Sequence, residues 1–182
     1  GLHWIGRRTQ TPNREAPMRS TTDFEEFAVA RTPHLFRTAW LLAGDRHHAE
    51  DLVQETLARM FRAWRGLERV ENPGAYAQTV LVRTFISQRR RRSSTERPTD
   101  QLPDSPAGEV DQALRVSLLA ALAELAPLDR AVLVLRFFED RSVEQVAHDL
   151  GRSPGAIRNR TSRALDRIRA VLGDGAVHLS LS

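Results

Sequence analysis

The sequence predicts an all-α protein made of two small helical domains joined by a flexible linker. Apolar side chains recur at helical spacing through most of the chain, and no stretch alternates as a half-buried strand would. A proline-rich acidic stretch at residues 93–112 is too long for a loop inside one compact domain. We therefore expect one domain at 23–92 and another at 113–172, with a disordered leader at 1–22 and a short tail at 173–182.

Three helices are expected in the N-terminal domain. The first begins at Thr22-Asp23-Phe24-Glu25, where Thr and Glu three residues apart can form a capping box, and ends at Gly44. The second covers Asp45 to Trp64, with one broad apolar stripe. The third opens at Asn72-Pro73, because Asn is a good cap and Pro has a helical φ at the first position. It runs into four consecutive arginines, Arg89 to Arg92.

Four helices are expected in the C-terminal domain. Ser142 and Gln145 have the spacing of a second capping box, and Gly151 ends that helix. The last two helices, separated by this glycine turn, have the spacing of a DNA-binding helix-turn-helix. A helical hairpin with a solvated basic face is the alternative. The expected helices cover Leu114–Leu125, Pro127–Phe138, Ser142–Leu150 and Ser153–Leu172.

The polar face of the last helix carries side chains suited to reading DNA. Arg can bond both acceptors of guanine in the major groove, and Asn can bond adenine in the same bidentate way. Arg160 and Arg169 flank the apolar stripe and are better placed for phosphates than for bases. The polar face consists of Arg158, Asn159, Ser162, Arg163 and Arg167.

The charge distribution also favours a nucleic-acid partner. The chain has 27 basic side chains, all of them arginine, and a net charge of only +4. The acidic linker masks two basic domains in that total. The run Arg89 to Arg92 spreads around the helix and cannot all face the core, so a nucleic-acid backbone is its natural partner. A solvated helix end favoured by the macrodipole is the alternative.

No catalytic arrangement is found, so we expect neither an enzyme nor a cofactor. The absence of cysteine excludes disulfides, thiolate nucleophiles and cysteine-ligated zinc. The stretch His47-His48-Ala49-Glu50-Asp51 could place metal ligands on one helix face. Acidic groups stabilise the first turn of a helix without any metal, however, and no second cluster completes a site, so we expect no metal. No apolar run is long enough to span a bilayer.

Three polar residues, Asp51, Gln54 and Glu55, lie together at the edge of the second helix, which is otherwise devoted to burial. A solvated face would explain them, and so would a docking surface for a partner. The sequence patterns considered so far leave both interpretations open.

Three stretches together resemble the extracytoplasmic-function group of bacterial sigma-70 factors, and in detail the SigE-like actinobacterial subset. They are AEDLVQETLARMFRAW (49–64), NPGAYAQTVLVRTFISQRRRR (72–92) and LAELAPLDRAVLVLRFFEDRSVEQVAHDLGRSPGAIRNRTSRALDRIR (122–169). The resemblance implies a sigma region 2 bundle at 23–92 and a region 4 helix-turn-helix at 113–172. It also implies a cytoplasmic, non-enzymatic factor that directs RNA polymerase to promoters.

The resemblance also implies roles for particular residues. Asp51, Gln54 and Glu55 would dock on the clamp helices of the largest polymerase subunit, and the C-terminal domain on the flap. The upstream minus-35 element would be read in double-stranded DNA by Arg158, Asn159, Ser162, Arg163 and Arg167. The minus-10 element, with its melted non-template strand, would be held by Arg83, Thr84, Ser87, Arg89, Arg90, Arg91 and Arg92. An anti-sigma factor is a further partner that the resemblance allows.

A stand-alone helix-turn-helix regulator, which binds duplex sites without polymerase, is the alternative function. Nothing in the sequence resembles a dimerisation helix or a ligand domain. That reading also leaves the polar edge of the second helix without a role.

Overall fold

The computed structural model describes residues 20–93 and 112–173, which form helices and short connections without a strand. This confirms the predicted all-α fold. The predicted leader, linker and tail lie outside the described residues except at their ends. In chain order the elements are α1 (Thr21–Ala43), α2 (Arg46–Ala63), the 3-10 helix η1 (Trp64–Leu67), α3 (Pro73–Ser93), α4 (Gln112–Glu124), α5 (Pro127–Leu133), the π-helix η2 (Val134–Phe138), α6 (Val143–Leu150) and α7 (Pro154–Leu172).

Most helix ends follow the predicted signals. The Asn72 side chain accepts a hydrogen bond from the Ala75 amide at 3.0 Å, which caps α3. Ser142 and Gln145 form the predicted capping box of α6. Gly44 ends α1 with a φ of 81°, a left-handed conformation that a residue without Cβ adopts easily.

The predicted start of the first helix was wrong by two residues. The capping residue of α1 is Ser20, whose Oγ accepts a hydrogen bond from the Asp23 amide at 3.2 Å. The Asp23 carboxylate in turn accepts from the Ser20 amide at 2.9 Å. Ser20 and Asp23 have the same spacing as Thr22 and Glu25. The earlier pair forms the capping box, so the helix begins earlier than predicted.

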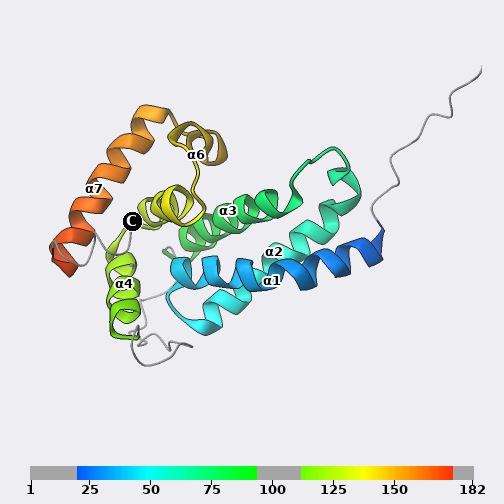
Figure 1. Ribbon diagram of the computed structural model, residues 1–182, viewed down its shortest axis with the longest axis horizontal. Helices are drawn as coiled ribbons and strands as arrows, with labels where there is room; N and C mark the ends of the chain where they lie inside the picture. The colour runs from blue at the N-terminus through cyan, green and yellow to red at the C-terminus, as the bar shows by residue number, and fades with distance from the viewer. Residues whose placement is uncertain (1–19, 94–111, 174–182) are drawn as a thin grey trace, which may run out of the picture.

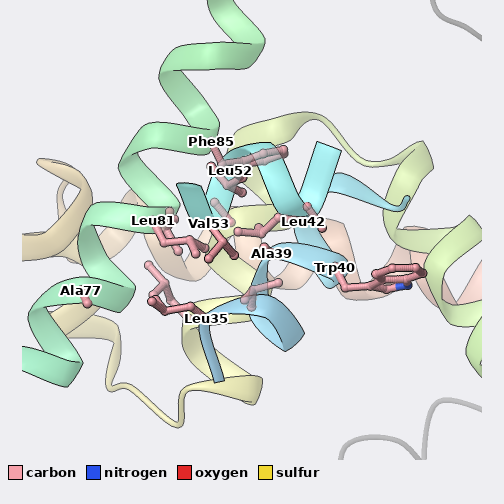
Figure 2. Close-up of a cluster of buried hydrophobic side chains, with 14 of the residues drawn as sticks. Leu35, Ala39, Trp40, Leu42, Leu52, Val53, Ala77, Leu81 and Phe85 are labelled. Carbon is pink, nitrogen blue, oxygen red and sulfur yellow. The ribbon is translucent and has the colours of Figure 1, made fainter. Parts of the chain in front are cut away.

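The first three helices form a bundle, in which α1, α2 and α3 lie side by side (Figure 1). Its core is filled by large aliphatic and aromatic side chains, and Figure 2 shows them converging from the three helices. Among them are Leu35, Ala39, Leu42, Leu52, Val53, Ala77, Leu81 and Phe85.

Helices α4 and α5 and the π-helix η2 pack directly against this bundle, and α7 packs on α4, α5 and α6. The main apolar cluster continues from the bundle into α5, η2, α6 and the start of α7, where it includes Val132, Leu135, Val146 and Ile157. The sequence analysis did not predict this packing, because the long linker suggested two separate bodies. A shared core is favourable because a domain of about 60 residues buries only a modest part of its apolar surface when alone.

One buried guanidinium joins helices from both halves of the chain. Arg130, in the middle of α5, is 4% exposed. It donates to the carbonyl oxygen of Leu42 in α1 at 2.5 Å, and to those of Ala123 and Leu125 at the end of α4 at 3.1 and 3.0 Å. It also lies 5.5 Å from the centre of the Phe85 ring of α3. Burial, with a smaller contribution from the nearby charge of Arg89, lowers the pKa of Arg130 to about 10, so it is still charged at neutral pH.

Replacing Arg130 by leucine should lower the free energy of unfolding by about 2–4 kcal/mol, because it leaves buried carbonyls without donors. Urea denaturation followed by circular dichroism measures this loss. The matched control is Arg152→Leu, at an exposed position between α6 and α7, which should change stability little. A loss at Arg130 no larger than that of the control would contradict the role assigned to the guanidinium.

Candidate nucleic-acid interface

Helices α6 and α7 form the predicted helix-turn-helix at the end of the molecule away from α2 (Figure 1). Gly151, with a φ of 63°, makes the turn between them. The Ser153 hydroxyl then accepts from the Ala156 amide at 3.1 Å, and Pro154 occupies the first helical position of α7. Ile157, Ala164 and Ile168 fix α7 by burying one face of it.

The five residues predicted to read DNA are all exposed. At 100° per residue they lie on the side of α7 away from the buried stripe, or at its flank. Arg158 also reaches Glu144 of α6 at 3.2 Å, but both side chains are more than half exposed, so the pair is weak and open to exchange. The face therefore presents three guanidiniums, one amide and one hydroxyl: Arg158, Arg163, Arg167, Asn159 and Ser162.

The two flanking arginines of α7 differ in their surroundings. Arg160 donates to Asp129 of α5 at 2.8 Å in a half-buried pair, so it holds α7 against α5. Arg169 is exposed and lies 3.5 Å from Asp166 of the same helix. Arg169 also lines a cavity of about 370 Å³ at the flank of α7, together with Arg136 and Arg158.

The residues of α3 that were predicted to contact the minus-10 element have very different surroundings. Arg83 is exposed, but its Nε donates to the Asp149 carbonyl oxygen at 2.6 Å. Ser87 is partly buried. Thr84 is completely buried and its hydroxyl has no hydrogen-bond partner, so the predicted contact of Thr84 with DNA does not fit this structure. Thr84 precedes Gln88 by four residues, and Gln88 bonds to α2, so this side of α3 faces α2.

The arginine run at the end of α3 does not form a uniform strip. Arg89 is partly buried, with its guanidinium 5.6 Å from the centre of the Phe85 ring. Burial and the neighbouring charge of Arg92 lower the pKa of Arg89. Arg91 lies 3.7 Å from Glu55 of α2, whereas Arg90 is exposed. Part of this charge therefore serves the contact between α2 and α3.

The three polar residues at the edge of α2 also differ in their surroundings. Asp51 and Gln54 are exposed, and Asp51 lies 3.5 Å from His47, one turn earlier. Glu55 instead accepts hydrogen bonds from Arg59 at 2.9 Å and from Gln88 of α3. Asp51 and Gln54 are thus open to a partner, while Glu55 also links two helices.

Comparison with known proteins assigns both halves of the chain to one family. Residues 29–95 match Sigma-70 region 2, and residues 121–170 match Sigma-70, region 4. The RNA polymerase sigma-E factor of Streptomyces coelicolor is 38% identical over 157 residues, which are 85% of this chain and 89% of that protein. The chain belongs to the sigma-70 family.

Other relatives of this sigma-70 factor place it in the extracytoplasmic-function group. The ECF RNA polymerase sigma factor SigL of Mycobacterium tuberculosis is 36% identical over 148 residues, covering 76% of this chain and 82% of the relative. Among solved structures, the sigma factor RpoE in complex with the anti-sigma factor NepR, from Bartonella quintana, is 27% identical with a TM-score of 0.68. That match covers 85% of this chain and 99% of the other. The chain is therefore a sigma factor for transcription initiation.

Some residues that organise this sigma factor were not singled out from the sequence. Arg130 and Arg141 are buried or nearly so and make contacts across the two halves of the chain. The sequence pattern does not show that such an arginine is buried. Its acceptors are oxygens of residues far away in the sequence, which no local spacing identifies. In the described part of the chain no three His, Cys, Asp or Glu side chains gather as metal ligands, and no helix could cross a membrane.

The pH dependence of stability should distinguish Glu55, which links α2 to α3, from the exposed Asp51. Burial alone raises the pKa of Glu55, but hydrogen bonds from Gln88 and Arg59 and the charges of Arg59 and Arg91 outweigh it and hold the pKa below its usual range. A lowered carboxylate pKa stabilises the fold above the pKa of the unfolded state, and this contribution is lost as the pH falls. Glu55→Gln should therefore lower the free energy of unfolding at pH 7 by about 0.5–1 kcal/mol.

Urea denaturation over a pH series tests this prediction. The difference between Glu55→Gln and the parent should begin to shrink below about pH 4.3, the usual glutamate pKa, and should vanish below the lowered pKa of folded Glu55, where the parent carboxylate is also neutral. Asp51→Asn, at the exposed edge, should leave stability nearly unchanged at each pH. Equal effects of the two substitutions, or a Glu55 effect that does not depend on pH, would show that the charge of the Glu55 carboxylate adds no stability.

Proposed function

We propose that this sigma factor docks on core RNA polymerase through the outer edge of α2 and carries two DNA-binding surfaces to the promoter. In this proposal α7 reads the minus-35 element in the major groove, and α3 holds the melted minus-10 element. The observation that carries the proposal is that one chain has an exposed reading face on α7, in its region 4, and an exposed polar edge on α2, in its region 2.

The docking surface consists of Asp51 and Gln54, with Glu55 at its border. A carboxylate and an amide are short, exposed groups that can pair with basic or polar side chains on the clamp helices of the largest subunit. Neither residue contributes to the apolar core, so burial does not explain their placement. We assign a second polymerase contact, on the flap, to the C-terminal half.

The minus-35 surface rests on the chemistry of α7. A guanidinium can bond both major-groove acceptors of guanine, and an amide can do so for adenine. Ser153 and Pro154 start the helix sharply, and the positive end of the helix dipole favours a phosphate near this end of α7. Arg158, Asn159, Ser162 and Arg163 are the base-reading set, with Arg167 one turn later.

The minus-10 surface is assigned to one end and one edge of α3. The phosphate or base contacts in this proposal are Arg83, Ser87 and the run Arg89 to Arg92. Thr84, which is buried, is not part of the proposed set. Trapping of unpaired bases here would assist melting, since extruding a base from the stack costs only a few kcal/mol.

The chain itself performs no chemistry in this proposal, and it acts in the cytoplasm with polymerase. When polymerase presents the two weak DNA-binding surfaces together, binding of one raises the effective concentration of the other at the promoter. Strong promoter binding is therefore expected only of the holoenzyme. The solved relative from Bartonella quintana is bound by an anti-sigma factor, and we propose that a protein of the same class controls this chain.

Reconstitution tests the proposed function. The full chain is mixed with core polymerase and genomic fragments, and transcripts are sequenced. The expected result is a set of start sites with shared minus-35 and minus-10 elements that core polymerase alone does not use. Binding to duplex sites without any association with polymerase would instead support a stand-alone regulator.

The α7 face yields a second test. Arg158→Ala and Arg163→Ala should each lose about 1–3 kcal/mol of discrimination between the selected minus-35 element and a scrambled one, because a bidentate base contact is removed. Arg37→Ala, which removes an exposed arginine of α1, is the matched control. Holoenzyme binding to both DNAs is measured by competition. Equal losses on the two sequences would mean that these side chains contact phosphate only.

A further inference from the structure

Two ion pairs hold the first half of α7, one on each side of its buried stripe. On one side Arg158 reaches Glu144 of α6 at 3.2 Å, and these side chains are 61% and 67% exposed. On the other side Nη1 of Arg160 donates to Oδ1 of Asp129 in α5 at 2.8 Å, and these side chains are 28% and 25% exposed. Ile157, which is completely buried, lies between the two arginines around the helix axis.

The two pairs differ in whether they can persist when α7 binds DNA. Arg158 must leave Glu144 before its guanidinium can reach a base, and so exposed a pair is weak. Arg160 lies only about 60° from the buried Ile157 around the helix axis, at 100° per residue. Its pair with Asp129 can therefore stay intact while the opposite face of α7 meets the groove.

The rotation of α7 about its own axis decides which side chains point into the major groove. A helix with its side chains has a radius of about 5–6 Å, so a rotation of about 20° moves the ends of those side chains by about 2 Å. This displacement exceeds the range of about 0.5 Å over which the lengths of hydrogen bonds vary. The buried stripe limits the rotation only in part, because one of its residues, Ala164, contributes a single methyl group.

We propose that the ion pair between Asp129 and Arg160 sets the rotation of α7, and that both are positioning residues for reading of the minus-35 element. This rests on the proposed function in one respect, which is the assignment of the minus-35 element to α7. Helix α5 is a firm support for the pair, because residues 130–133 are all buried. Asp129 lies in the first turn of α5, where the helix dipole stabilises its charge. Arg160 thus acts through the orientation of the reading face and does not itself contact a phosphate.

Amide hydrogen exchange in the free full chain tests the positioning without DNA or polymerase. Asp129→Asn should speed exchange in α7 by about three- to fivefold, because the helix loses one of its attachments. The matched control is Glu124→Gln, which removes one exposed carboxylate at the end of α4 and should leave exchange in α7 unchanged. Equal exchange of α7 in the parent and in both variants would overturn the proposal.

The consequence for DNA is measured with the holoenzyme, by competition between the selected minus-35 element and a scrambled one. Asp129→Asn and Arg160→Gln should each lower the preference for the selected element about fivefold, the lower end of what one bidentate base contact contributes. Glu124→Gln should keep the preference of the parent. A parent without any preference would contradict the proposed function, whereas a parent preference that both pair variants retain would contradict only this inference.

A phosphate contact by Arg160 is the competing explanation, and it predicts different results. Asp129→Asn would then free the guanidinium and tighten binding to both DNAs. Arg160→Gln would weaken binding to both DNAs equally, and it would reduce the slope of log affinity against log salt by about 0.9. Either result would overturn the positioning role, which predicts a loss of preference with an unchanged slope.

Exchange of the two charges separates positioning from a general disturbance of the fold. Asp129→Arg and Arg160→Asp each bring like charges together, so each alone should lower the preference for the selected element. The double variant has an ion pair between α5 and α7 again and should be more selective than either single variant. Circular dichroism establishes that each variant is folded. A double variant no more selective than the single ones would overturn the proposal, because a phosphate contact cannot be restored by a carboxylate at position 160.

Discussion

The guanidinium of Arg130 is a buried charge, and the arrangement of both halves depends on how that charge is accommodated. Removing a cation from water is costly unless hydrogen bonds replace its hydration. Here the acceptors are carbonyl oxygens at the ends of α1 and α4, where backbone oxygens lack partners within the helix and carry the negative end of the helix dipole. The ring of Phe85 adds a favourable π face from α3. One side chain of α5 therefore donates hydrogen bonds to carbonyl oxygens in both halves of the chain.

This arrangement decides which surfaces of the sigma factor reach solvent. Joining the halves at α1 and α3 leaves the outer edge of α2 and the polar face of α7 exposed, at separate ends of the molecule (Figure 1). The same packing buries Thr79 of α3 against Arg141, whereas Arg83 stays exposed although its Nε donates to the Asp149 carbonyl oxygen. The surfaces proposed for polymerase docking and for the minus-35 element are both exposed in this structure.

Much of the fold was predictable because its signals are local. Helix caps such as Asn72 and Ser153, glycine ends such as Gly44, and apolar stripes at helical spacing each depend on residues within one or two turns. The exposed face of α7 followed from the same periodicity. The burial of Thr84 was not predictable, because a small polar residue gives no signal of burial and its position against α2 is set by the packing of two helices. The ion pair between Arg160 and Asp129 was not predictable either, because it joins two helices.

The sequence by itself determined the helices, the helix-turn-helix, the exposed polar face of α7 and, through two matching regions, the family. These features arise from contacts between near neighbours in the chain or from patterns that one helix displays on its own. Only the tertiary structure decided that the halves share one core, that Glu55 links α2 to α3, and that Glu139 and Arg141 bond to α1 and α3. Those contacts join backbone and side-chain atoms up to about a hundred residues apart. Their partners are hydroxyl, carboxylate and backbone oxygens, which no local spacing rule can identify.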